Sequence, residues 1–310
     1  MVPIGDGAKS VFAQGEMRQV VLQFAAVNLD DAEASADMKT TVATAFAALN
    51  ERDKALETVL SALKEWPQHI PAILLHARIK ASSDDVPGAL ALVDEALAAN
   101  AQHLGALLFK AELQRYAQRD RDTALATYRQ ALAAHPKAVA AHAGIITLLL
   151  EQRDSAAAKA QFERLKAAQP AHPETMLFDA QFAYLDGNFA RTRELLEPLL
   201  RAFPNDMRVV QLAGVTELRL NSLSQAEAHL GRVVKAQPND RLPRQLLARI
   251  YNRTGQPGKA MEVLRPIVDS NNADSTSLTL AGEALLQTGD LARAEAAFAR
   301  ATKVNPQATT

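Results

Sequence analysis

The sequence predicts an all-α protein in which pairs of short amphipathic helices stack into a solenoid. Three observations lead to this prediction. Small and apolar residues recur with a period of 34 residues, a turn residue divides each period in two, and a proline closes most periods. The last complete unit, 275–308, shows the pattern most clearly and serves here as the reference unit, numbered from position 1 at Ser275.

The reference unit reads as two helices that pack closely against each other. Small residues stand at positions 7, 8, 20 and 27, and larger apolar residues at positions 4, 11 and 24. Positions 4, 7, 8 and 11 share one face of the first helix, and positions 20, 24 and 27 share one face of the second. Small residues let the two backbones approach, and the larger ones fill the space beside them. Gly289 suits a left-handed turn, Asp290 can cap the second helix, and Pro306 ends it.

The same frame holds upstream from Ala36 with one inserted residue. The expected repeats are 36–69, 70–104, 105–138, 139–172, 173–206, 207–240, 241–274 and 275–308, followed by a tail at 309–310. Residues 1–35 hold a degenerate N-terminal repeat, with Gly15 and Glu16 at its turn. There we expect a partial helix, a helix near 18–26, and then an acidic connector with the sequence LDDAEAS.

This pattern resembles the tetratricopeptide (TPR) signature, whose period is 34 residues. Arrays of this kind bury their apolar faces only by stacking, and the stack forms a right-handed superhelix with the first helices along its concave surface. We therefore expect a TPR α-solenoid of about eight helix-turn-helix repeats, a single solenoid over 36–308, plus the degenerate N-terminal repeat.

Four prolines test the frame. Pro198 and Pro266 both fall at position 26, inside the second helices of repeats five and seven, where proline removes a hydrogen bond and bends the helix. Pro87 and Pro257 fall in the first turn of a second helix, where proline is tolerated.

Composition and charge exclude several classes of protein. The 34 Lys and Arg residues balance 35 Asp and Glu residues, which argues against binding nucleic acid or a membrane surface through bulk charge. The absence of cysteine excludes disulfides, thiolate metal sites and a cysteine nucleophile. No apolar run approaches the roughly 18 residues of a membrane span, and the N-terminus lacks the features of a signal peptide.

No catalytic motif is present, and we expect a protein that is not an enzyme and needs no cofactor. The sequence has no P-loop, no HExxH, no GxSxG and no CxxC. The seven histidines are scattered, and His135 and His142 straddle the loop at Pro136, so we expect no metal site.

The candidate binding residues are those at positions 2, 5, 9, 12 and 13 of the first helices, which should face the concave groove. They are apolar and aromatic in the middle repeats and basic or amide-bearing in repeats six and seven. The full set is Leu74, Phe109, Leu113, Tyr116, Leu177, Tyr184, Arg208, Gln211, Arg219, Gln245, Arg249, Asn252 and Arg253. Exposed aromatics and arginines dominate binding energies at interfaces. The alternative, that Phe109, Tyr116 and Tyr184 pack between neighbouring first helices, stays open.

We expect the partner to be a protein or peptide. Four arginines at the C-terminal end of the groove favour an acidic peptide segment, a C-terminal carboxylate, or an anionic polymer such as a polysaccharide.

Several stretches also resemble one bacterial family, the TPR-repeat protein of the PEP-CTERM/exosortase system (the PrsT family). They include AQGEMRQVV, LLFKAELQRYAQRDRDTALATYRQAL, RLPRQLLARIYNRTGQPGKAMEVLRPIV and LTLAGEALLQTGDLARAEAAFARA. The resemblance implies a lipoprotein scaffold for exopolysaccharide production and PEP-CTERM protein sorting, located in the bacterial envelope and facing the periplasm. Members are longer and begin with a lipidated cysteine, so we expect the present chain to be part of a longer array with its anchor elsewhere.

Two other functions fit a TPR array. One is a cytoplasmic co-chaperone-like module that holds a C-terminal carboxylate. Against it, the groove positions of the first repeat are Asp37, Thr40, Thr44 and Ala47 instead of the lysines and asparagines of a carboxylate clamp. The other is the recognition arm of a larger enzyme, such as a glycosyltransferase.

Overall fold

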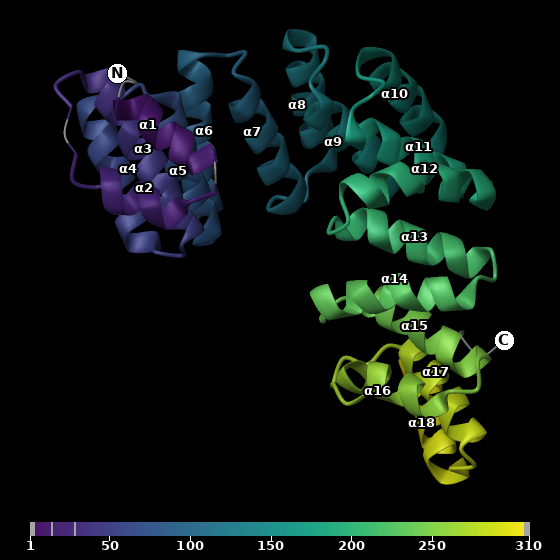
Figure 1. Ribbon diagram of the computed structural model, residues 1–310. Helices are drawn as coiled ribbons and strands as arrows, with labels where there is room; N and C mark the ends of the chain where they lie inside the picture. Colours follow the sequence, from purple (N-terminus) through teal and green to yellow (C-terminus); the bar gives the residue numbers. More distant parts are fainter. Residues whose placement is uncertain (1–3, 14, 28, 307–310) are drawn as a thin grey trace. The chain divides into compact units, whose positions relative to one another are not determined.

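The computed structural model describes residues 4–13, 15–27 and 29–306, and every regular element among them is an α-helix (Figure 1). The expected TPR-type solenoid is confirmed. The chain divides into two compact units, Met1–Ala168 and Gln169–Thr310. Each unit is a row of helical hairpins in which every helix packs against the next one along the chain.

The first unit contains ten described helices. They are α1 (Ile4–Ala13), α2 (Met17–Phe24), α3 (Ala32–Ala48), α4 (Arg52–Glu65), α5 (Ile70–Ser82), α6 (Val86–Ala99), α7 (Leu104–Tyr116), α8 (Arg121–Ala134), α9 (Val139–Glu151) and α10 (Ser155–Ala168). From α3 onward, odd-numbered helices are the first helices of the repeats and even-numbered helices are the second.

The acidic connector expected before Ala36 is shorter than the sequence analysis proposed. Helix α3 begins at Ala32, and the carboxylate of Asp31 accepts a hydrogen bond of 2.7 Å from the backbone N–H of Ala34. Asp31 therefore acts as a helix cap, and the alanines and glutamate that follow it are good helix formers. Four of the seven residues of the expected connector, 32–35, form the first turn of a 17-residue helix.

The second unit contains eight described helices, which are coloured green to yellow in Figure 1. They are α11 (Pro173–Leu185), α12 (Phe189–Ala202), α13 (Met207–Arg219), α14 (Leu223–Ala236), α15 (Arg241–Arg253), α16 (Pro257–Val268), α17 (Ser275–Gln287) and α18 (Leu291–Val304). Within this unit α11 contacts α13, α13 contacts α15 and α15 contacts α17, so the first helices lie side by side.

The turn between the two helices of a repeat has the same backbone conformation in all eight expected repeats. Position 15 has a positive φ in each of them, a conformation that favours glycine. The eight residues are Asn50, Asp84, Arg119, Arg153, Gly187, Asn221, Gly255 and Gly289, with φ between 56° and 77°. Three of the eight are glycine, and the 34-residue frame imposes the turn on the other five.

The core of each hairpin depends on small residues at the helix contact. A Cβ built on Gly282 of α17 would lie 2.6 Å from the ring of Phe298 in α18, and one on Gly214 of α13 would lie 2.8 Å from Leu230 in α14. Both glycines stand at position 8 and both large residues at position 24. In these two repeats position 8 thus holds the small residue that the close helix contact requires.

The prolines lie where the frame places them. Pro87 and Pro257 lie in the first turns of α6 and α16, while Pro198 and Pro266 lie inside α12 and α16, which run through them. No helix in the described part of the chain is both long and apolar enough to cross a bilayer.

Candidate functional site on the first helices

The apolar candidate residues of the first unit lie mainly in its core. Leu74, Phe109 and Leu113 are 6–8% exposed and pack in one cluster formed by α5, α6 and α7. The guanidinium of Arg78 lies 4.4 Å from the centroid of the Phe109 ring and covers it. For these residues the structure shows packing between neighbouring first helices, the alternative left open above. Tyr116 differs, because it is 66% exposed at the end of α7.

In the second unit the aromatic candidate belongs to a cluster that also contains a cation. Leu177 is buried in the core, whereas Tyr184 is half-buried and meets Phe189 edge-on, with 5.2 Å between ring centroids. The guanidinium of Arg219 lies 5.2 Å from the centroid of the same Phe189 ring. Phe189 was not among the sequence candidates because it starts a second helix. This cluster is held together by ring stacking and a cation–π contact.

Arg208 is tied to two carboxylates. Its guanidinium donates to Glu174 at 2.9 Å, one period upstream, and to Asp206 at 2.8 Å. The hydrogen bond from Arg208 holds the pKa of the Asp206 carboxyl below its usual value, and the same contact raises the pKa of the guanidinium. Arg208 therefore links α11 to α13, and its charge is already balanced.

Three further candidates link neighbouring repeats. Gln245 donates to Asp274 and Ser277, both at 2.9 Å. Asn252 donates to the carbonyl of Leu280 at 2.9 Å, and Arg253 donates to Asn221 at 2.6 Å. These side chains form a ladder across the first helices of the second unit.

Arg249 is different, because its exposed side chain makes no hydrogen bond or ion pair with any other residue that the structure describes. It lines an open cavity of about 460 Å³ between α15 and α17. The other lining residues are Ser275, Thr276, Thr279, Leu280 and Glu283. Gln211 on α13, which is half-buried, likewise makes no hydrogen bond within the described part of the chain.

The cavity around Arg249 offers donors and acceptors suited to a polar ligand. A guanidinium can donate two parallel hydrogen bonds to a carboxylate, and the hydroxyls can donate or accept. Glu283 already accepts from Asn252 at 3.2 Å and has lone pairs left to accept from an amide. Thr276, Thr279 and Glu283 stand at positions 2, 5 and 9 of the eighth repeat. The rule that selected Arg249 would therefore have found them had it been carried one repeat further. Among the described residues no three acidic or histidine side chains form a group that could hold a metal ion.

The chain resembles known TPR sequences over much of its length. A tetratricopeptide repeat family matches residues 115–175 and 183–250, and the family described as anaphase-promoting complex, cyclosome, subunit 3 matches residues 221–301. The match to the tetratricopeptide family thus runs from the end of α7 to α15, with a gap at residues 176–182.

Solved structures and one curated protein show the same resemblance. The Cut9–Hcn1 tetramer of the anaphase-promoting complex aligns with a TM-score of 0.69 at 13% identity, covering 96% of this chain and 57% of that one. A tetratricopeptide repeat protein from Parabacteroides merdae aligns with a TM-score of 0.54 at 17% identity, over 77% of this chain and 94% of that one. Cellulose synthase operon protein C of Pseudomonas fluorescens is 34% identical over 90 residues, which are 29% of this chain but only 7% of that protein.

The fold and the sequence repeats define the class of the protein as a TPR-type solenoid, a scaffold for protein–protein interaction. Proteins of this class are typically non-catalytic. The structural similarity establishes the fold, and the ligand has to be argued from the site.

Proposed function

We propose that the chain is a non-catalytic scaffold that binds a protein partner on the first helices of its second unit, at the cavity around Arg249. The observation that carries this proposal is the exposed, unpaired guanidinium of Arg249 in a cavity lined with hydroxyls and a carboxylate. An exposed arginine with no internal partner is available to an incoming peptide, and arginine is enriched among the residues that dominate binding.

The neighbouring candidates would support the site rather than bind directly. Gln245 and Asn252 hold α15 against α17, so the backbone around the cavity is fixed before a ligand arrives. A site that is fixed in advance loses less conformational entropy on binding. The ligand that suits Arg249 best is an extended peptide with an acidic side chain.

We place this scaffold in bacterial exopolysaccharide production. Two observations support the assignment: the local similarity to cellulose synthase operon protein C, and the resemblance of several stretches to the TPR-repeat protein of the PEP-CTERM/exosortase system. The link to PEP-CTERM sorting rests on the second observation alone. On this proposal the array lies in the envelope and faces the periplasm, and a lipid anchor would be supplied from outside this segment.

A pull-down tests the binding proposal. The immobilised wild-type chain and the Arg249→Glu variant are incubated with envelope and cytosolic extracts of the cells that produce the protein, and bound proteins are quantified by mass spectrometry. Arg201→Glu is the matched control, because Arg201 is exposed on α12 and away from the cavity. We expect Arg249→Glu to lose an envelope protein that the wild type and the control retain. Equal recovery by all three chains would refute the site.

A further inference from the structure

A second kind of pocket recurs between consecutive second helices, over the first helix that lies between them. It occurs between α8 and α10, between α14 and α16, and between α16 and α18. In all three the lining includes positions 7, 11, 19, 22 and 23 of one repeat and position 28 of the repeat before it. We call these the outer pockets. Because they occupy equivalent positions, differences among them come from their side chains.

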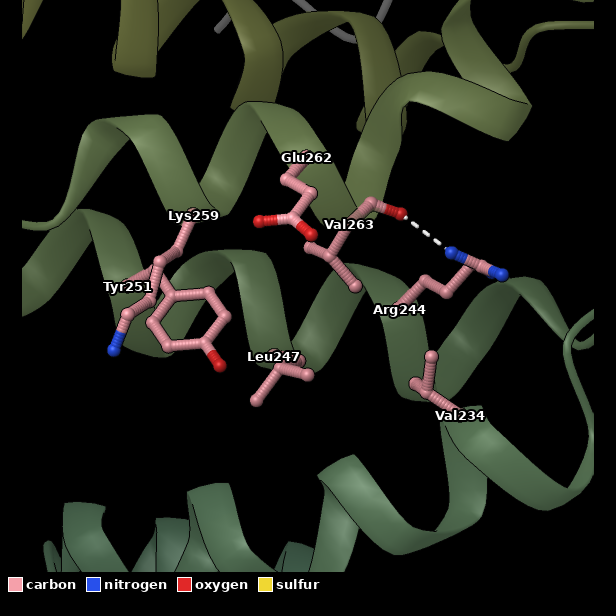
Figure 2. A pocket seen from close by; sticks show the side chains of 7 residues that line it. All are labelled: Val234, Arg244, Leu247, Tyr251, Lys259, Glu262 and Val263. Carbon is pink, nitrogen blue, oxygen red and sulfur yellow. Dashed lines mark hydrogen bonds between the residues drawn. The ribbon is translucent and has the colours of Figure 1, made fainter.

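In the outer pocket between α14 and α16 the cationic side chains have partners within the structure (Figure 2). Arg244 donates to the carbonyl of Val263 at 2.9 Å, and Lys259 lies over the ring of Tyr251 at 5.4 Å. The carboxylate of Glu262 also lines the pocket. Burial raises the pKa of Tyr251 to about 12, so its hydroxyl keeps its proton. Lys259 also lies 3.9 Å from the carboxylate of Glu227, so both cations of this pocket have a partner within the structure.

In the outer pocket between α16 and α18 both arginines also have partners. Arg300, at position 26, donates to the carbonyl of Val268 at 3.0 Å, and Arg293 donates to Asp290 at 3.4 Å. The side chain of Asp269 is a further acid in the lining. The volume of this pocket is about 190 Å³, against about 460 Å³ between α8 and α10.

In the outer pocket between α8 and α10 the two arginines have no such partners. Arg164 stands at position 26, as Arg300 does, and Arg129 lies on the opposite helix; both are exposed. Neither makes a hydrogen bond or ion pair with any other residue that the structure describes. No acidic side chain lines this pocket, and its one amide, Gln161, is already bonded to His142 at 2.6 Å.

The floor of the α8–α10 pocket is apolar. Ile145 and Leu149 of α9 form it and are 2% and 7% exposed, with Leu132 of α8 beside them. Ala157 and Ala160 of α10 stand where the α14–α16 pocket has Lys259 and Glu262. The replacement of two charged side chains by alanine leaves no carboxylate in the lining, and the exposed apolar surface between the two unpaired guanidinium groups comes from Leu132, Ala157 and Ala160.

We propose that the outer pocket between α8 and α10 is a docking site for an acidic segment of a partner protein, one that presents a large apolar side chain between carboxylates. The apolar side chain lies against Leu132, Ala157 and Ala160, and the carboxylates pair with Arg129 and Arg164. Charge complementarity selects this occupant, because the pocket carries two positive charges and no negative one. Burial of the apolar side chain excludes water around the ion pairs, which strengthens them. The site lies in the first unit and on second helices, so it is independent of the cavity around Arg249.

The test uses a defined probe, a fluorescein-labelled peptide with a pair of leucines flanked by glutamates, titrated against the whole chain by fluorescence anisotropy. Two matched peptides replace the leucines with serine or the glutamates with lysine. We expect the Arg129→Glu/Arg164→Glu variant to bind the probe at least tenfold more weakly than the wild type. The charge-matched control Arg191→Glu/Arg201→Glu, on exposed positions of α12, should bind as the wild type does.

A second variant tests whether the space in the pocket is needed, without changing its charge. Ala160→Trp fills the pocket and keeps both arginines, so it should also weaken binding at least tenfold, while circular dichroism shows an unchanged helix content. The proposal is overturned if the wild type does not bind the probe, if either matched peptide binds equally well, or if the variants bind normally. It is also overturned if laurate binds at the pocket and the probe does not. The proposal is likewise overturned if sedimentation shows that the chain self-associates, that Arg129→Glu/Arg164→Glu abolishes this self-association, and that the probe does not compete with it.

Discussion

The guanidinium of Arg244 donates a hydrogen bond of 2.9 Å to the backbone carbonyl of Val263, within the turn of α16 that precedes Pro266 (Figure 2). Proline has no N–H to offer the carbonyl of Glu262, four residues before it and next to the carbonyl that Arg244 reaches, and its ring disturbs this turn of the helix. Arg244 also donates to the carbonyl of Pro238 at 2.8 Å. One side chain at position 4, where the reference unit has leucine, thus bonds both to the helix that contains Pro266 and to the loop between repeats.

The contact between Arg244 and α16 should be coupled to the proline. We expect Arg244→Met to lower the free energy of unfolding by about 1–2 kcal/mol, because two carbonyls lose a charged donor. In a Pro266→Ala background the cost should fall by about 0.5 kcal/mol or more, since a regular helix needs less support from outside. Urea denaturation of the four chains measures this, together with hydrogen exchange in α16. Strictly additive costs would show that the two residues act independently.

Position 15 offers a stabilising substitution. Arg153 has a φ of 62°, which costs a residue with a Cβ on the order of 1 kcal/mol. We expect Arg153→Gly to raise the free energy of unfolding by about 0.5 kcal/mol, because relief of this cost exceeds the extra entropy of glycine in the unfolded chain. Gly289→Ala, at the same position, should lower it by about 1 kcal/mol. Thermal melts compare the two, and a destabilised Arg153→Gly chain would contradict the expectation.

The close helix contact at position 8 predicts opposite effects for two alanine substitutions. Gly282→Ala brings a Cβ to 2.6 Å from the Phe298 ring, and we expect a loss of about 1–3 kcal/mol. Gly231 lies inside α14 with no atom within 4 Å of its added Cβ. Gly231→Ala should therefore stabilise by about 0.5–1 kcal/mol through helix propensity. Equal shifts in the denaturation midpoint would argue against close packing.

Two half-buried histidines should make stability depend on pH. Burial lowers the pKa of His76 and His229 below their ordinary value of 6.5. The unfolded chain then binds more protons than the folded chain below about pH 6.5, so this part of the stability is complete above that pH and is lost as the pH falls. We expect the urea midpoint to drop between about pH 7 and pH 5, with a shallower drop in His76→Gln/His229→Gln. An unchanged slope in that variant would assign the dependence to other groups.

Much of the fold follows from periodicity, because a solenoid has mainly local contacts and the same helix–helix packing recurs in each repeat. The turn at position 15 and the glycine at position 8 are visible in the sequence, and so is the spacing that puts Arg208 one period after Glu174. The start of α3 at Ala32 was missed, because a single capping aspartate decides it.

The binding surface follows less well from the sequence. Position 5 faces the inner surface in principle, yet Phe109 is closed over by the neighbouring first helix and by Arg78. Which arginines remain unpaired depends on side-chain conformations. Arg300 and Arg164 hold the same position, and only Arg300 reaches a carbonyl of the preceding repeat. Periodicity predicts the same contacts for Arg300 and Arg164, so only the three-dimensional structure shows that they differ.

The central claim, that a partner binds the first helices around Arg249, is tested most directly by photo-crosslinking. A photoreactive amino acid replaces Thr279 in the cavity or, as the matched control, Ala296 on the outer side of the same repeat. After irradiation in extracts of the producing cells, we expect one partner protein to crosslink strongly from position 279 and weakly or not at all from position 296. Crosslinking of that partner from position 296 alone would contradict the claim.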